Sequence, residues 1–190
     1  MPEEQKRKIL FAHSGGAQGG PGEGSYDLVH WLRTTLGPDF EVDYSTISNP
    51  AAPTYSAWKS LFDQAFPELP AGSFLVGHSL GGSMLLKYLS ESRPGTAPGG
   101  LFLIASPFWG VKDWDVEEFK LVEDFGARLP EIPNVYLYHS LDDPIVPFDH
   151  SSLYVSALSH AIMRRIQGDE HAFGRGLTEL TEDIQNIVNA

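Results

Sequence analysis

The chain of 190 residues contains no cysteine. This absence excludes disulfide bonds, metal sites built from thiolates and a cysteine nucleophile. The chain also lacks any run of 18 or more apolar residues, so the sequence predicts no membrane-spanning helix. Aromatic residues make up 12% of the chain, which argues against disorder. We therefore expect a globular domain that is large enough to bury a continuous core.

Positive charge is scarce in this sequence. The chain has 13 lysines and arginines against 25 aspartates and glutamates, which gives a formal net charge of −12. Nucleic acids and anionic membrane surfaces are bound through clustered basic side chains, so we expect neither as a partner. The acidic side chains between residues 113 and 124 are expected to form a solvated helix face.

The first residues carry charge rather than a hydrophobic stretch. Residues 1–8 have no apolar segment and no small-residue cleavage site, so the sequence predicts no signal peptide. Together with the missing cysteines, this favours a cytoplasmic protein.

Strand-like and helix-like segments alternate along the chain, which predicts an α/β fold. We expect strands at residues 8–13, 40–45, 73–77, 100–105, 134–139 and 161–166. We expect helices at residues 23–36, 54–66, 172–189 and from residue 80 to just before Pro94. The predicted architecture is a single domain over residues 1–190, a three-layer α/β/α sandwich around a doubly wound, mostly parallel sheet of about six strands, with no lid domain.

The most informative segment is a G-x-S-x-G sequence, which runs from Gly77 to Gly81 with Ser79 at its centre. It lies directly after a predicted strand and directly before a predicted helix, which is the context of a nucleophile elbow. The start of the helix would favour negative charge beside the serine. A glycine-rich turn that merely contains serine is the alternative, and the context favours Ser79 as a nucleophile.

A serine nucleophile needs a general base and a group that orients the base. On a doubly wound sheet, loops at the carboxyl ends of later strands supply them. Asp142 and Asp143 both follow the predicted strand at 134–139. We prefer Asp143 as the acid because it precedes Pro144, which favours an extended backbone. Asp142 is alternatively a turn residue that caps the loop.

Seven histidines are candidates for the base. His171 follows the last predicted strand and precedes the last helix, so its loop can reach the same sheet edge as Ser79. His150 is the rival, since it lies only seven residues after Asp143, but it precedes the last strand. His78 is expected to pack beside the nucleophile. We therefore select His171.

An oxyanion hole needs two backbone N–H donors. Leu80, which follows the nucleophile, should supply one. The glycine-rich loop after the first strand should supply the other, with Gly15 as first choice and Ser14 as second. This loop carries no dinucleotide-binding or phosphate-binding sequence pattern, which disfavours a nucleotide site.

The insertion at residues 106–133 is rich in aromatic side chains. It follows the strand that should neighbour the strand before Ser79. We therefore expect Phe108, Trp109 and Trp114 to shape the pocket for an acyl group, with plain core packing as the alternative.

With these motifs in place, the chain resembles the α/β hydrolases, and specifically the small lidless serine hydrolases of the retinoblastoma-binding protein 9 / YdeN group. The resemblance rests on Gly-His-Ser-Leu-Gly at the elbow, Asp-Asp-Pro-x-x-Pro around the acid and His-x-Phe before the last helix, and it covers nearly the whole chain. It implies Ser79 as nucleophile, Asp143 as acid and His171 as base. The chain departs from the group at Glu170, where glycine usually precedes the histidine.

The resulting functional hypothesis is an esterase-like serine hydrolase that cleaves a small acyl substrate through an acyl-enzyme. It needs no metal or organic cofactor, because the side chains supply the nucleophile, the base and the charge stabilisation. A binding protein that keeps the fold without the activity is the alternative, since the fold alone does not fix the function. The sequence does not indicate an oligomeric state.

Overall fold

The computed structural model describes residues 6–92, 94–95, 97–168 and 170–190. Its centre is a sheet of six parallel strands in the order β2-β1-β3-β4-β5-β6. The predicted doubly wound α/β sandwich is thus confirmed. The strands are β1 (Arg7–Ala12), β2 (Phe40–Asp43), β3 (Phe74–His78), β4 (Gly100–Ile104), β5 (Val135–Ser140) and β6 (Ile162–Ile166).

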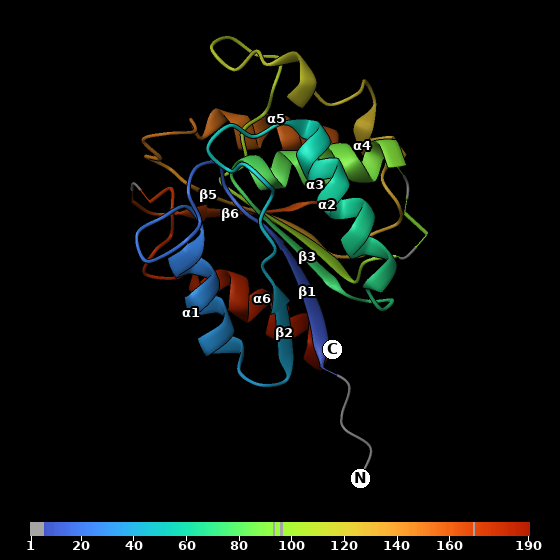
Figure 1. Cartoon of the computed structure of the whole chain (residues 1–190), viewed down its shortest axis with the longest axis vertical. Helices are drawn as coiled ribbons and strands as arrows, with labels where there is room; N and C mark the ends of the chain where they lie inside the picture. The colour runs from blue at the N-terminus through green and yellow to red at the C-terminus, as the bar shows by residue number, and fades with distance from the viewer. Residues whose placement is uncertain (1–5, 93, 96, 169) are drawn as a thin grey trace.

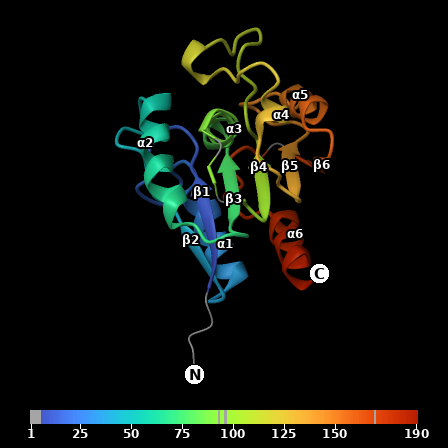
Figure 2. The same cartoon turned by 90° about the vertical axis from the view of Figure 1, so that its right-hand side faces the viewer.

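Helices cover both faces of the sheet (Figures 1 and 2). One face packs against α1 (Tyr26–Leu36) and α6 (Thr178–Asn189). The other face packs against α2 (Tyr55–Ala65), α3 (Leu80–Ser92), α4 (Phe125–Arg128) and α5 (Asp149–Ala157). Short 3₁₀ turns lie at η1 (Phe66–Glu68) and η2 (Glu117–Phe119). Within the described residues, no helix is long and apolar enough to cross a membrane.

Sequence patterns explain the central elements. Every residue of β3 and of β4 is buried, as expected for continuous apolar runs that are covered on both faces. In α1 the buried residues Leu28, Leu32 and Leu36 recur every four positions, which turns one side of the helix to the sheet. In α2 the Thr54 hydroxyl accepts a hydrogen bond from the Ala57 N–H and caps the helix start.

The connectivity determines where a site can form. The chain leaves β1 towards β2 in one direction and then returns past β1 to β3, β4, β5 and β6. Right-handed crossovers then require α1 on one face and the helices from α2 to α5 on the other. The order reverses between β1 and β3, and ligands of open α/β sheets bind at the carboxyl ends of strands at such a point.

Several element predictions were wrong in detail. The last helix begins at Thr178 rather than at residue 172, because Phe173 and Gly176 have φ angles of 50° and 104° and break the helical path. The first helix begins at Tyr26 rather than at residue 23. Helix α5 was not predicted, since its buried residues include His150 and Ser151 rather than an apolar stripe. The acidic segment is exposed as predicted, but only η2 within it is helical.

Candidate active site

Ser79 lies on the sharp turn that joins β3 to α3, in the geometry of a nucleophile elbow. Its φ angle is 52°, a conformation that residues other than glycine rarely adopt. The turn is possible because the residues two positions before and two positions after Ser79 are glycines. A Cβ at Gly77 would collide with the backbone of Gly82, and a Cβ at Gly81 would collide with the carbonyl oxygens of Ala12 and His13. The sequence thus holds Ser79 in a strained, half-buried position at the floor of a cleft, against the end of β1.

The structure brings Ser79, His171 and Asp143 together. The Ser79 hydroxyl lies 3.1 Å from His171 Nε2. On the other side of the ring, His171 Nδ1 lies 2.8 Å from Asp143 Oδ2 and 3.1 Å from Oδ1. A neutral imidazole in this arrangement donates from Nδ1 to the carboxylate and accepts from the hydroxyl at Nε2. The three side chains predicted from the sequence therefore form one hydrogen-bonded series.

The Asp143 carboxylate is fully buried and has several hydrogen-bond donors. Oδ1 accepts hydrogen bonds from the Ile145 and Val146 N–H groups, at 2.8 and 3.0 Å. Oδ2 lies 3.3 Å from His139 Nε2. Burial alone would raise the pKa of Asp143, but the hydrogen bonds from His139, His171 and Ile145 outweigh it and hold the pKa well below its ordinary value. Asp143 is therefore a carboxylate, whereas the side chain of Asp142 is exposed.

His150, the alternative candidate for the base, lies in a different element, and within the described residues it forms no hydrogen bond with Ser79. It lies in α5, where its Nδ1 accepts a hydrogen bond of 2.8 Å from the Phe108 N–H, and its ring contacts Trp114. Burial lowers the pKa of His150, and nearby His139 lowers it further. His150 thus fixes the start of the β4–β5 connection rather than contacting Ser79.

His78 lies beside the nucleophile, as predicted, but it is also a buried bridge between loops. Its Nε2 donates to the His171 carbonyl oxygen at 2.8 Å, and its Nδ1 lies 2.8 Å from the Ser25 hydroxyl. Burial, and then the neighbouring His171 ring, lowers the pKa of His78 to about 3, so it is neutral. Neither this bridge nor the contact from His139 to Asp143 is predicted by the sequence. Only the proximity of His139 to Asp143 along the chain could have pointed to the second one.

The two expected N–H donors lie on the same cleft as Ser79. Leu80 is the first residue of α3, and Gly15 lies in the loop after β1. Among the hydrogen bonds of the described residues, neither backbone N–H has an acceptor. Ser14, the second choice, donates its N–H to the Ser25 hydroxyl at 2.8 Å and is therefore occupied.

The cleft above Ser79 has a volume of about 470 Å³. Trp109 and Trp114 line it as predicted, and their rings contact each other with centroids 5.3 Å apart. Phe108 is not among the residues that line the cleft. Its partly buried ring packs against Phe125 and Tyr154, which favours the alternative of core packing at this position. The remaining lining residues are Ser14, Gly15, Gly22, Gly24, Pro53, His78, Ser79, Leu80, Pro107, Phe119, Ile145, His171 and Ala172.

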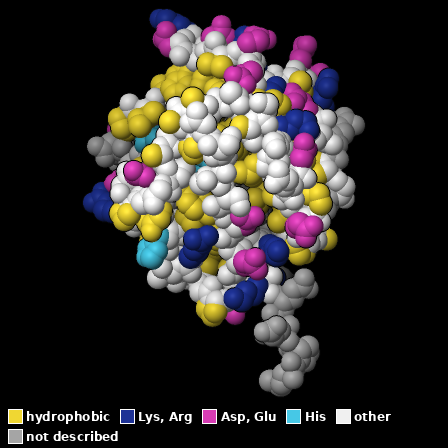
Figure 3. Space-filling model, viewed as in Figure 1, with side chains coloured by type: hydrophobic (Ala, Val, Ile, Leu, Met, Phe, Trp, Pro, Cys, Tyr) yellow, Lys and Arg dark blue, Asp and Glu magenta, His cyan; other side chains and the backbone are white. Residues whose placement is uncertain are grey.

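Among the described residues, no charged side chain lines this cleft. None of its lining residues is Asp, Glu, Lys or Arg. Glu170, where the chain departs from the resembling group, forms an exposed ion pair with Arg175. On the face shown in Figure 3, apolar side chains gather at the upper left, below the charged tip of the β4–β5 connection. The described residues contain no group of three or more His, Asp or Glu side chains arranged to hold a metal ion.

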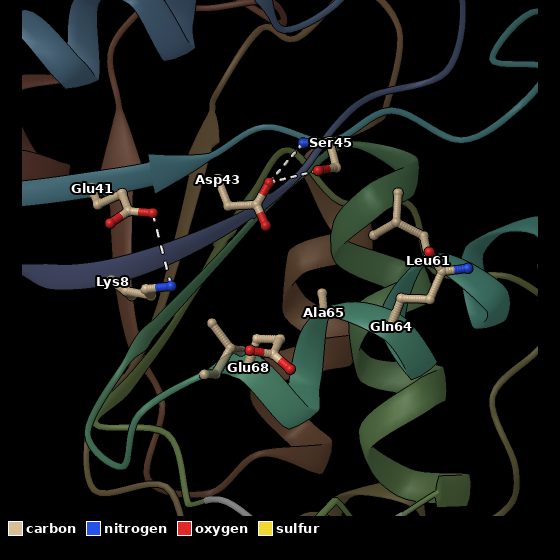
Figure 4. Close-up of a pocket in the computed structure, with 9 residues that line it drawn as sticks. Lys8, Glu41, Asp43, Ser45, Leu61, Gln64, Ala65 and Glu68 are labelled. Atoms are coloured by element: carbon tan, nitrogen blue, oxygen red, sulfur yellow. Dashed lines mark hydrogen bonds and ion pairs between the residues drawn. The ribbon is translucent and has the colours of Figure 1, made fainter.

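A second hollow, of about 240 Å³, lies between β2 and α2 (Figure 4). Four of its polar residues form two pairs. Lys8 lies 3.8 Å from Glu41, and Asp43 accepts hydrogen bonds from the backbone and the hydroxyl of Ser45. Among the described residues that line this hollow there is no histidine, so the Ser45 hydroxyl has no contact of the kind that Ser79 makes with His171.

The fold and the elbow define the class: the chain has the α/β-hydrolase fold without a lid, as the sequence resemblance predicted. No protein-family model matches the chain, and no curated protein matches it in sequence.

Solved structures show the likeness in detail. The ydeN gene product from B. subtilis is 18% identical, with a TM-score of 0.74 over 98% of this chain and 100% of that one. Est1E from Butyrivibrio proteoclasticus is 15% identical, with a TM-score of 0.65 over 100% of this chain and 91% of that one. XC6422 from Xanthomonas campestris, an α/β serine hydrolase without a lid, is 16% identical, with a TM-score of 0.60 over 100% of this chain and 84% of that one. At these identities the likeness establishes the fold.

Proposed function

We propose that this protein is a serine hydrolase that cleaves carboxylic esters of small, uncharged acyl groups through an acyl-enzyme. The observation that carries the proposal is the series from Ser79 Oγ to His171 Nε2, at 3.1 Å, and from His171 Nδ1 to Asp143, at 2.8 Å. Nucleophile, base and orienting acid within hydrogen-bonding distance are what an activated serine requires.

In the first half-reaction, Ser79 Oγ attacks the acyl carbon and His171 Nε2 takes the hydroxyl proton. The Leu80 and Gly15 N–H groups, which have no acceptor within the described protein, stabilise the negative charge that develops on the carbonyl oxygen. Asp143 keeps His171 in the tautomer that accepts this proton and stabilises the imidazolium that forms. The ring then returns the proton to the leaving alcohol.

In the second half-reaction, a water molecule attacks the acyl-enzyme. His171 takes a proton from this water and passes it to Ser79 Oγ as the carboxylic acid leaves. No metal or organic cofactor takes part in this scheme, because the side chains provide every proton transfer. The electron pair of the broken ester bond stays on the leaving oxygen in the first step and on Ser79 Oγ in the second.

The walls of the cleft support the choice of substrate. Trp109, Trp114, Phe119 and Ile145 offer apolar surface, and no charged side chain among the lining residues could pair with a charged acyl group. Transfer of an unpaired charge into such surroundings is unfavourable. An uncharged alkyl or aryl acyl group is therefore the best complement to these walls.

Labelling with a fluorophosphonate probe tests the proposal. We expect the wild type to be labelled and to hydrolyse p-nitrophenyl butyrate, and Ser79→Ala to do neither while keeping its circular dichroism spectrum. Ser83→Ala is the matched control and should be labelled as the wild type is. Ser83 lies in the same helix, α3, but it is buried and donates its hydroxyl to the Pro107 carbonyl oxygen. Equal labelling of wild type and Ser79→Ala would reject Ser79 as the nucleophile. A folded wild type without labelling or turnover would favour the non-catalytic binding protein.

A further inference from the structure

The loop between β1 and α1 is rich in glycine, yet its conformation is tightly held. The side chain responsible is Gln18, which is only 7% exposed although it lies between Ala17 and Gly19. A buried amide must find partners for both its oxygen and its nitrogen. Its partners show what this residue does for the loop.

Each end of the Gln18 amide meets groups of the complementary kind. Nε2 donates to the carbonyl oxygens of Ser14 and Gly16, at 3.0 and 2.9 Å. Oε1 accepts from the Ser25 N–H at 2.9 Å and from the Tyr44 hydroxyl at 2.6 Å. Carbonyl oxygens on one end and donors on the other leave a single orientation for the amide. The side chain thus joins the start of the loop to its end and to the segment after β2.

The hydrogen bond to the Ser14 carbonyl has a consequence for Gly15. The Ser14 C=O and the Gly15 N–H belong to one planar trans peptide, so they point in opposite directions. The same carbonyl oxygen also lies 2.6 Å from His13 Nδ1, whose ring accepts the Ile47 N–H at Nε2 and therefore carries its proton on Nδ1. With the carbonyl held inward by two donors, the Gly15 N–H must face outward. Gly15 is exposed there and lines the cleft together with Leu80.

A second, independent observation concerns Gly24. It has a φ angle of 51°, and a Cβ at this position would overlap the Gln18 amide. Because Gly24 has no side chain, the end of the loop that precedes α1 leaves space for the Gln18 amide. Both ends of the loop therefore pack against this amide.

We propose that Gln18 is a positioning residue for the oxyanion hole: it fixes the peptide plane that presents the Gly15 N–H to the substrate carbonyl oxygen. This inference rests on the proposed function of the cleft. Gln18 itself is not among the residues that line the cleft, so it acts through the loop and not on the substrate.

Gln18→Glu is the sharpest test. Glutamate keeps the shape and can still accept from Ser25 and Tyr44, but it replaces the donor to Ser14 and Gly16 with a carboxylate oxygen. Because loss of one oxyanion donor costs about 10²- to 10³-fold in kcat, we expect kcat to fall about 10- to 100-fold with KM changed less than about threefold. Affinity for a trifluoromethyl ketone, which forms an oxyanion adduct with the nucleophile, should fall by a similar factor.

Three comparisons make the result decisive. Rates are divided by the concentration of sites labelled by fluorophosphonate, which removes the effect of misfolded protein. Tyr44→Phe is the matched control, because it removes one donor to Oε1 and leaves both bonds of Nε2, so kcat should stay within about threefold of wild type. Gln18→Met, an uncharged side chain of similar length, should lower kcat in the same way if Gln18→Glu fails to fold.

Wild-type kcat and ketone affinity in Gln18→Glu or Gln18→Met would overturn the positioning role. So would a rise in KM that accounts for the whole loss of kcat/KM. Either result leaves the hydrolase proposal intact as long as Ser79→Ala is inactive. An active Ser79→Ala would overturn the proposed function, and the role of Gln18 with it.

Discussion

At the scale of single residues, the most constrained group is the Asp143 carboxylate. Two backbone N–H groups and the rings of His171 and His139 surround it, and its side chain has no exposed surface. Such a carboxylate cannot rotate without breaking several hydrogen bonds. The neighbouring Asp142 contributes its backbone N–H to the Gly168 carbonyl oxygen while its side chain remains exposed. Two adjacent aspartates therefore have very different surroundings.

This contrast gives a prediction for a matched pair of variants. Asp143→Asn should lower kcat for p-nitrophenyl butyrate by at least about 10²-fold, and Asp142→Asn should lower it by less than about tenfold, because only Asp143 sets the tautomer of His171. Steady-state kinetics on both variants, with chemical denaturation as a check of folding, make the comparison. The opposite ranking would assign the orienting acid to Asp142.

The sequence was sufficient to place Ser79, Asp143 and His171, since each lies in a short motif after a strand and parallel strands bring their carboxyl ends to one edge.

The sequence was not sufficient to place Phe108. The choice between the cleft and the core at that position depends on where α5 packs, and α5 has no apolar stripe from which to predict it. Gln18 was missed for a similar reason. Its partners Ser25 and Tyr44 lie 7 and 26 residues away along the chain and belong to no recognised motif.

At the scale of elements, the strands were easier to predict than the helix ends. Strands such as β4 are apolar throughout, so burial alone marks them. The start of α6 depends instead on the backbone angles of Phe173 and Gly176, whereas the helical spacing of Phe173 and Leu177 with the apolar residues of α6 predicts an earlier start. Tertiary contacts on both sides of His171 override that tendency: His78 binds its carbonyl oxygen, and Asp143 binds its ring.

Helix α6 is attached to the sheet by a polar contact as well as by apolar packing. Asp183, which is 4% exposed, accepts the Tyr138 hydroxyl at 2.8 Å and two hydrogen bonds from Arg164, at 3.0 and 2.6 Å. Arg164 is 41% exposed and can regain water if the pair is broken, whereas the Tyr138 hydroxyl is buried. The larger penalty for losing Asp183 therefore falls on Tyr138.

We predict that Asp183→Ala lowers the free energy of unfolding by about 1–3 kcal/mol, because it leaves a buried hydroxyl without its acceptor. Urea denaturation measures this change. Glu182→Ala, at the exposed neighbouring position of α6, should change stability by less than about 0.5 kcal/mol. Equal losses in the two variants would contradict the contact as a source of stability. Activity per labelled site should remain, since none of these residues lines the cleft.

At the scale of the whole molecule, buried histidines make stability depend on pH. Burial lowers the pKa of His13, partly offset by the hydrogen bond to Ser14, and burial with the nearby His171 lowers the pKa of His78 to about 3 from 6.5. The folded protein therefore keeps these rings neutral while the unfolded chain protonates them. Below pH 6.5 the unfolded state binds more protons, so the free energy of unfolding falls as the pH falls.

His78→Gln isolates this contribution. Glutamine can donate and accept hydrogen bonds but does not titrate, so the variant should lose less stability than wild type between pH 6.5 and about pH 4. One proton changes the slope by at most about 1.4 kcal/mol per pH unit. Urea denaturation at several pH values measures both slopes. Acidification also reduces the repulsion among the negative charges that give the net charge of −12. This effect is the same in the wild type and in His78→Gln, so it does not change the difference between their slopes. Identical slopes would mean that His78 is protonated in the folded state.

The all-parallel sheet determines when the residues around Ser79 can come together during folding. Neighbouring parallel strands cannot be joined by a tight turn, so every strand pairing closes a long loop of chain. The conformational entropy of that loop is lost before the strand contacts can compensate for it. Such topologies fold slowly. Ser79, Asp143 and His171 follow β3, β5 and β6, so the serine meets its base only after the carboxyl-terminal half has joined the sheet. If Ser79 is the nucleophile, as proposed, a partly folded chain carries it without its base, and labelling of Ser79 by fluorophosphonate should begin only once β5 and β6 have joined the sheet.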